Sequence, residues 1–252
     1  MRNALYILVL IGLVCITVAC FLYDQHYSGI VVGILLFAYI TFLSWASSNI
    51  RSNVFLKSIS QVEKGKLAIT FDDGPSEVTN EFLDVLQKHN VSATFFLIGK
   101  KIQGNEEIVK RIVADGHAIG SHSYRHDYLY AVKSSKNIEN DLVDCSAAIE
   151  QVTGNKPQLF RPPFGVTTPR LASAVKRLGL YSVGWTIRTN DGVEADPRKI
   201  EDNIFKKELS GSIVLFHDTN RKSLGPLKKL IATTKELGIE IVSLQNEVIG
   251  YV

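Results

Sequence analysis

From residue 66 onward, short apolar runs rich in β-branched and aromatic residues alternate with longer segments whose apolar residues recur at helical spacing. The short runs predict strands at residues 67–71, 93–98, 118–121, 159–161, 181–185, 213–217 and 240–242. The longer segments predict helices at residues 77–88, 106–114, 135–152, 169–178, 197–208 and 224–237. Such alternation is typical of repeated βα units, in which helices surround parallel strands. The pattern predicts an α/β fold, and we favour an irregular (β/α) barrel of about seven parallel strands over an open doubly wound sheet.

The first fifty residues have a different pattern, with two long uncharged stretches in place of this alternation. Their apolar parts span residues 4–23 and 29–46, and each approaches the ~20 residues that an α-helix needs to cross a bilayer. A short polar joint at residues 24–26 separates them, so residues 1–50 are predicted to form a transmembrane helical hairpin. The alternative for the first stretch is a signal peptide, one form of which is a lipoprotein signal ending at Cys20, although the stretch is long for a signal peptide.

The charged residues bear on partners and on membrane orientation. The formal net charge is only +3 and the two signs are interleaved, which argues against nucleic acid as a partner. Arg2 and the basic residues after residue 50 flank the hairpin on one side, whereas its turn carries Asp24. The flanking side has an excess of only a handful of positive charges, and by the positive-inside rule this excess favours a cytoplasmic location for residues 66–252. The protein is thus predicted to be a two-pass protein of the cell (inner) membrane. We expect residues 51–65 to be a neck or linker, and no protein partner is indicated.

Two polar clusters follow predicted strands and have the composition of a metal site. The first, TFDDGP, contains the adjacent carboxylates Asp72 and Asp73, and the second contains His122 and His126 four positions apart. Four-residue spacing lets both imidazoles point the same way across one helical turn, and neutral imidazole is a favoured zinc ligand. Asp73, His122 and His126 would leave coordination positions open, as a catalytic site for a divalent metal, preferably Zn²⁺, requires.

Two further clusters also follow predicted strands. In the first, RPPFG, Arg161 is fixed by prolines and can hold a carboxylate through two hydrogen bonds. In the second, His217 at a strand end can donate a proton to a leaving amine. Taken separately, the RPPFG segment also fits an ordinary proline-rich loop, and His217 also fits a helix-capping histidine.

The order of these motifs, with an Asp near a Trp between the last two, resembles the polysaccharide deacetylase family, also called the NodB homology domain or carbohydrate esterase family 4. The resemblance covers residues 66–218 and extends the domain to residue 252. It implies a metal held by Asp73, His122 and His126. It further implies catalytic roles for Asp72 as general base, Arg161 as its tether, His217 as general acid and Asp191 as the residue that orients His217. The implied substrate-binding residues are Phe164, through its backbone N–H, Gly165, Trp185 and Leu215.

The chain departs from the family pattern in the fourth motif. Gly192 stands where a second Trp is usual, and Arg188 occupies a place often held by a carboxylate. We expect the missing aromatic wall to widen the pocket or alter acyl specificity, unless another ring such as Trp185 or Tyr124 fills the same space.

These features together predict a membrane-anchored, metal-dependent hydrolase that removes an N-acetyl or formyl group from an amino sugar. The expected partners are the membrane and an N-acylated glycan, in a polysaccharide or peptidoglycan, or a polyprenyl-linked sugar. A cytoplasmic domain would favour the lipid-linked sugar, and an external one the wall polymer. Two alternatives remain open from the residues alone: an inactive metal-binding domain that recognises glycan or acts as a scaffold, and an O-acetyl esterase using the same groups.

Overall fold

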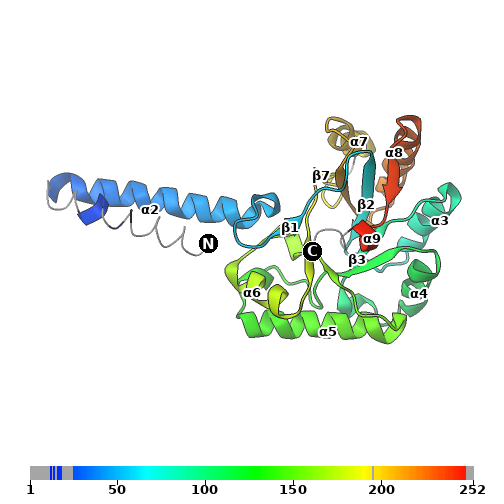
Figure 1. The fold of residues 1–252 in the computed structure, drawn as a ribbon, viewed down its shortest axis with the longest axis horizontal. Coiled ribbons are helices and arrows are strands. Elements are labelled where there is room, and N and C mark those ends of the chain that lie inside the picture. The colour runs from blue at the N-terminus through cyan, green and yellow to red at the C-terminus, as the bar shows by residue number, and fades with distance from the viewer. Residues whose placement is uncertain (1–11, 13, 15, 19–24, 195, 248–252) are drawn as a thin grey trace.

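The computed structural model describes residues 12, 14, 16–18, 25–194 and 196–247. Helix α2 (Gln25–Ser48) projects as a long rod from an α/β domain (Figure 1). Its segment Gly29–Ser48 has a mean hydropathy of 2.1 and is long and apolar enough to cross a membrane. This segment matches the second predicted span, whereas most of the first, at 4–23, lies outside the described residues.

The described part of the domain contains a sheet of nine strands in which every ladder is parallel. The strand order is β1-β6-β5-β4-β3-β2-β8-β7, with β9 paired to β2. The strands are β1 (Ser58–Ile59), β2 (Lys66–Asp72), β3 (Thr94–Leu97), β4 (Ala118–Ser121), β5 (Leu159–Phe160), β6 (Tyr181–Val183), β7 (Ile187–Arg188), β8 (Ser212–His217) and β9 (Glu240–Val242). All seven predicted strands are present, and the prediction of a parallel sheet is confirmed.

Helices follow the strands and surround the sheet (Figure 1). They are α3 (Thr79–His89), α4 (Glu106–Ala114), α5 (Ser135–Thr153), α6 (Pro169–Arg177), α7 (Pro197–Phe205), α8 (Leu224–Glu236) and the short α9 (Leu244–Glu247). Local sequence explains several of their boundaries. Asp196 caps α7 by accepting a hydrogen bond from the Arg198 N–H, and Gly154 ends α5 in the left-handed region at φ 74°.

One bent segment joins the two ends of the sheet. Strand β6 pairs with β5 and β1, whereas β7, four residues further on, pairs with β8. Between them, Thr186 donates its N–H to the Ile213 carbonyl of β8 at 3.0 Å. The sheet therefore curls on itself, consistent with the predicted irregular (β/α) barrel. Strands β1 and β7 were not predicted because two residues form no recognisable apolar run.

The segment 51–65, expected as a neck or linker, contributes to the domain. It contains β1, which pairs with β6, and it buries Leu56 and Val62. The core between β2, β3 and α3 is aromatic, with the rings of Phe71 and Phe95 stacked at 4.8 Å and that of Phe82 packed edge-on against Phe71 at 5.2 Å. This packing fixes β2, and with it the position of the carboxylates at its end.

Candidate active site

Four strands deliver polar side chains to the same edge of the sheet. Asp72 ends β2 and His217 ends β8, and the two residues are paired in register on these neighbouring strands. His122 follows β4, and Arg161 follows β5. Because parallel strands end at one edge, residues far apart in the chain gather there. They surround a cavity of about 480 Å³ lined by Asp72, Asp73, His122, His126, Tyr128, Phe164, Gly165, Trp185, Arg188, Asn190, Gly192, Val193, Leu215 and His217.

Asp73, His122 and His126 are brought together, with one ligand atom of each lying within 4.8 Å of the others. Asp73 Oδ1 is 3.6 Å from His122 Nε2 and 3.4 Å from His126 Nε2. His122 Nδ1 lies 2.8 Å from the Arg161 carbonyl oxygen, which fixes the ring so that Nε2 faces Asp73. Burial, and next the nearby His122, lowers the pKa of His126 to about 4, so this imidazole is neutral at neutral pH.

The donor atoms of Asp73, His122 and His126 are suited to binding a divalent cation. Asp73 Oδ1 is buried and has no hydrogen-bond partner among the described residues, although a buried carboxylate oxygen without a partner is costly. One carboxylate and two imidazoles form a donor set of the kind found in catalytic zinc sites, and three protein ligands leave a position open. A cation at this point would satisfy the Asp73 oxygen.

Asp72 is held by Arg161 and kept apart from this ligand set. The Arg161 guanidinium is fully buried and donates to Asp72 Oδ1 and to Thr70 Oγ1, each at 2.8 Å. It also donates to the carbonyl oxygens of Val183 and Gly184 on the bent segment of the sheet, and its Cζ lies 4.2 Å from the centroid of the Phe96 ring. Burial lowers the pKa of Arg161, and the adjacent Asp72 carboxylate opposes that effect. Asp72 thus has a fixed orientation, with Oδ2 3.8 Å from His122 Nε2.

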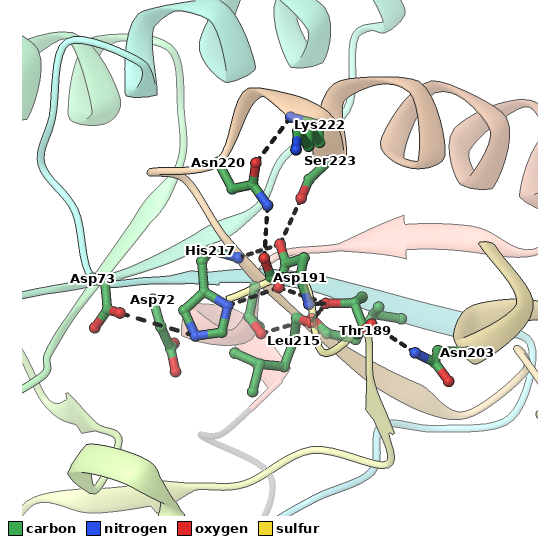
Figure 2. A network of polar contacts seen from close by, with 12 residues as sticks. Asp72, Asp73, Thr189, Asp191, Asn203, Leu215, His217, Asn220, Lys222 and Ser223 are labelled. Atoms are coloured by element: carbon green, nitrogen blue, oxygen red, sulfur yellow. Dashed lines mark hydrogen bonds and ion pairs between the residues drawn. The ribbon is translucent and has the colours of Figure 1, made fainter. Parts of the chain in front are cut away.

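His217 lines the cavity and forms a dyad with Asp191 (Figure 2). Asp191 Oδ1 lies 2.7 Å from His217 Nδ1. Burial by itself would lower the pKa of His217, but the Asp191 carboxylate outweighs it and raises the pKa to about 9. For Asp191, burial raises the pKa and the hydrogen bond from His217 lowers it, with a net lowering. At neutral pH the imidazole therefore carries a proton on Nε2, which is 4.0 Å from Asp73 Oδ2.

The predicted substrate-binding residues all line the cavity. Phe164 adopts a left-handed backbone at φ 58°, and its ring stacks on Tyr128 at 5.3 Å. Gly165 lies against Trp185, since a Cβ at Gly165 would come within 2.4 Å of the indole. Leu215 is almost fully buried, two residues before His217. These positions are compatible with the predicted roles, which stay predictions.

The two departures from the family pattern also line the cavity. The three atoms nearest to a Cβ built on Gly192 all belong to the His217 ring, at 3.2–3.5 Å. Neither aromatic residue considered as a replacement is among them: Trp185 packs on Gly165, and Tyr124 packs on Gly99. The face of the His217 imidazole beside Gly192 is therefore left uncovered by this residue.

The sequence analysis missed the residues that hold Asp191. Thr189 donates to Asp191 Oδ1 at 2.7 Å, and Ser223 donates to Oδ2 at 2.7 Å. Asn220 donates its side-chain amide to the Asp191 carbonyl at 2.6 Å (Figure 2). Thr189 could have been noticed, because a hydroxyl two residues before an aspartate often bonds to it locally. Ser223 and Asn220 follow the next strand, and no local signal connects them with Asp191.

Comparison with known proteins agrees with this geometry. Residues 60–183 match a family model described as polysaccharide deacetylase. A peptidoglycan-N-acetylglucosamine deacetylase from Bacillus cereus is 35% identical over 192 residues, which cover 73% of this chain and 88% of that protein. One from Listeria monocytogenes is 32% identical over 197 residues, 77% of this chain, so that the match spans only 41% of that relative's length. A solved structure of a CE4 family pseudoenzyme from Bacillus anthracis has a TM-score of 0.71 at 27% identity, covering 76% of this chain and 68% of that one.

A curled parallel sheet with its reactive groups gathered at the carboxyl ends of the strands defines an α/β enzyme domain of the barrel type. The sequence matches narrow this class further. The chain belongs to the polysaccharide deacetylase family.

Proposed function

We propose that this chain is a metal-dependent deacetylase that removes the N-acetyl group from an amino sugar in a glycan. The observation that carries the proposal is the position of two proton-transfer groups beside the metal cluster. Asp72 Oδ2 is 3.8 Å from His122 Nε2, and His217 Nε2 is 4.0 Å from Asp73 Oδ2. Hydrolysis of an amide requires a base that accepts a proton from the attacking water and an acid that donates a proton to the leaving amine, and here both groups flank one site.

Each residue has an assigned part in that reaction. A cation held by Asp73, His122 and His126 would supply Lewis-acid polarisation, and zinc is the ion that best suits these ligands. Asp72, held by Arg161, accepts a proton from the attacking water as the water oxygen bonds to the acyl carbon. The C–N bond then breaks, and His217 Nε2 donates its proton to the leaving nitrogen, which releases acetate and a free amine. We assign the Phe164 N–H to the oxyanion and Leu215 to the acyl methyl group.

The proposal includes a membrane anchor. Helix α2 exposes large apolar side chains such as Ile34, Phe37 and Ile40, which a water-soluble surface would not tolerate along such a length. We propose that α2 crosses the bilayer, that residues 4–23 form a second span, and that the protein lies in the cell membrane with two passes. A reporter enzyme fused to the C-terminus, active in only one compartment, decides the side on which the domain lies.

The substrate class follows from the relatives and the anchor. The two relatives named above are peptidoglycan-N-acetylglucosamine deacetylases, which supports an N-acetylhexosamine glycan as substrate. A domain on the cytoplasmic side would meet lipid-linked sugars, whereas a domain on the outer side would meet wall polymer. Both carry the same N-acetyl group, so the chemistry proposed above is unchanged.

The experiment is an assay of acetate release by the full chain in detergent with zinc, on polymeric and lipid-linked N-acetylhexosamines. We expect release that a chelator abolishes and zinc restores. Asp72→Asn should keep the bound zinc and lose at least about 10²-fold in rate, since it removes the base and leaves the metal ligands in place. Absence of release from every N-acetyl substrate would contradict the proposal and favour a domain that binds glycan without reaction. An O-acetylated glycan assayed in parallel distinguishes esterase from amidase activity.

A further inference from the structure

A positively charged side chain, that of Arg188, lines the cavity, and the proposed reaction does not use it. Arg188 ends β7 and is paired in register with Leu215 of β8. Its neighbours in sequence, Ile187 and Thr189, are fully buried, whereas Arg188 is exposed and lines the cavity together with Asp72 and His217. The alternation of the strand therefore directs this one charged side chain toward the site.

The Arg188 side chain lies near an aromatic ring and has no carboxylate partner among the described residues. Its guanidinium carbon lies 5.8 Å from the centroid of the Trp185 ring, which is within the range of a cation–π contact. No carboxylate among the described residues lies within 4.0 Å of it. Of the acidic groups in and beside the cavity, Asp72 is paired with Arg161, Asp191 is paired with His217, and Asp73 belongs to the cluster with His122 and His126. The guanidinium is thus held on an aromatic face with its donors available.

The lining of the same cavity leaves room for a ligand next to His217. Gly192 carries no side chain, and the nearest atoms to a Cβ at that position belong to His217. Val193, the next residue, is 91% exposed and does not close the space. A group attached to a bound sugar can therefore extend past His217 toward Arg188. Guanidinium is a planar fork that matches carboxylate and phosphate oxygens in two parallel hydrogen bonds.

We propose that Arg188 binds an anionic substituent, a carboxylate or a phosphate, on the sugar that is deacylated. The chain would then act preferentially on acidic amino sugars. This inference rests on the proposed deacetylase function and specifies its substrate. Carboxylate and phosphate share the chemistry that Arg188 recognises, and the test separates them.

The test compares three N-acetylglucosamine substrates that differ in one substituent: a neutral oligomer, an oligomer with an ether-linked carboxylate on the sugar, and a sugar phosphate. With the zinc-loaded full chain we expect at least one acidic substrate to have a KM about 10-fold lower than the neutral one. Arg188→Gln should bring the two KM values together with little change in kcat, and Arg188→Lys should retain part of the preference. Arg198→Gln is the matched control, because it removes an exposed arginine of α7 that does not line the cavity.

A binding measurement separates failure of this inference from failure of the proposed function. Calorimetric titration of the same substrates into the Asp72→Asn chain needs no turnover, and Asp72→Asn/Arg188→Gln is its comparison. Tighter binding of an acidic sugar that disappears with Arg188 supports the inference even if acetate release is not observed. Equal affinity for acidic and neutral sugars, or a preference that survives in Arg188→Gln, overturns it and leaves deacetylation of neutral sugars intact.

Discussion

Asp191 holds His217 at two points with one carboxylate: Oδ1 lies 2.7 Å from the ring Nδ1, and Oδ2 accepts the backbone N–H of the same residue at 2.9 Å. The double contact fixes both the position of the strand end and the direction of the imidazole. Ser223 and Thr189 each donate a hydrogen bond to this carboxylate. The orientation of His217 at the end of β8 therefore depends on the loop after β7 and on the turn that follows β8. A histidine positioned in this way is ready to donate a proton from Nε2.

Replacing Asp191 with Ala should lower kcat by about 10²–10³-fold, because His217 loses the partner that orients it and keeps it protonated. Zinc content should stay at one per chain, since Asp191 does not contact the metal cluster. Ser223→Ala, which removes only one donor to Asp191, should cost less than about 10-fold. The measurements are steady-state kinetics and metal analysis of the purified variants. An unchanged kcat in Asp191→Ala would contradict the assignment of His217 as the general acid.

Gly192→Trp should narrow acyl specificity. A side chain at this position begins 3.2 Å from the His217 ring and would cover the part of the imidazole that Gly192 leaves uncovered. Turnover of an N-propionyl substrate should therefore fall several-fold more than turnover of the N-acetyl substrate. Leu237→Trp adds the same ring at an exposed position that does not line the cavity and serves as control. An unchanged ratio of propionyl to acetyl turnover would show that Gly192 does not set the width of the pocket.

Gly165→Ala should destabilise the protein and damage the cavity wall. At φ 69° an L-residue is strained by about 1 kcal/mol, and its Cβ would lie 2.4 Å from the Trp185 ring. The clash should add about 1–3 kcal/mol to the loss in free energy of unfolding. Gly154→Ala provides a matched control, with φ 74° and no atom within 4 Å of the new Cβ. Urea unfolding compares the two; equal losses would contradict the proposed packing of Trp185 on Gly165.

His117 should make the protein less stable in acid. Its Nδ1 accepts the Ala93 N–H at 3.2 Å and its Nε2 has no partner among the described residues, while burial lowers its pKa from 6.5 to about 4. Because the pKa is lower in the folded state, this contribution to stability is complete above pH 6.5 and is lost as pH falls toward 4.

The expected loss from His117 is about 3 kcal/mol. His117→Asn keeps an acceptor for Ala93 and does not titrate, so its free energy of unfolding should fall less than the wild-type value between pH 7 and 4. Parallel curves for the two proteins would show that His117 does not account for the acid sensitivity.

The sequence by itself determined the features that depend on local order. Apolar runs of three to six residues identified seven strands, since a buried parallel strand needs a continuous apolar run. The clusters around Asp73 and His122 stood out because each follows such a run, and parallel strands that end at one edge must bring them together. The apolar helix α2 was equally evident, since a long stretch without charge is costly in water.

Tertiary structure alone decided how the sheet closes and what surrounds the reactive groups. The sequence predicts one strand at residues 181–185 and no bend, and only the hydrogen bonds to β8 reveal that the segment between β6 and β7 joins the two ends of the sheet. The bond from Ser223 to Asp191 connects residues 32 apart, a pairing that no local pattern encodes. The contact of Arg188 with Trp185 likewise depends on the curl of the strand. Side-chain chemistry can be read from the chain, but the direction of each group is set by packing between elements that are distant in sequence.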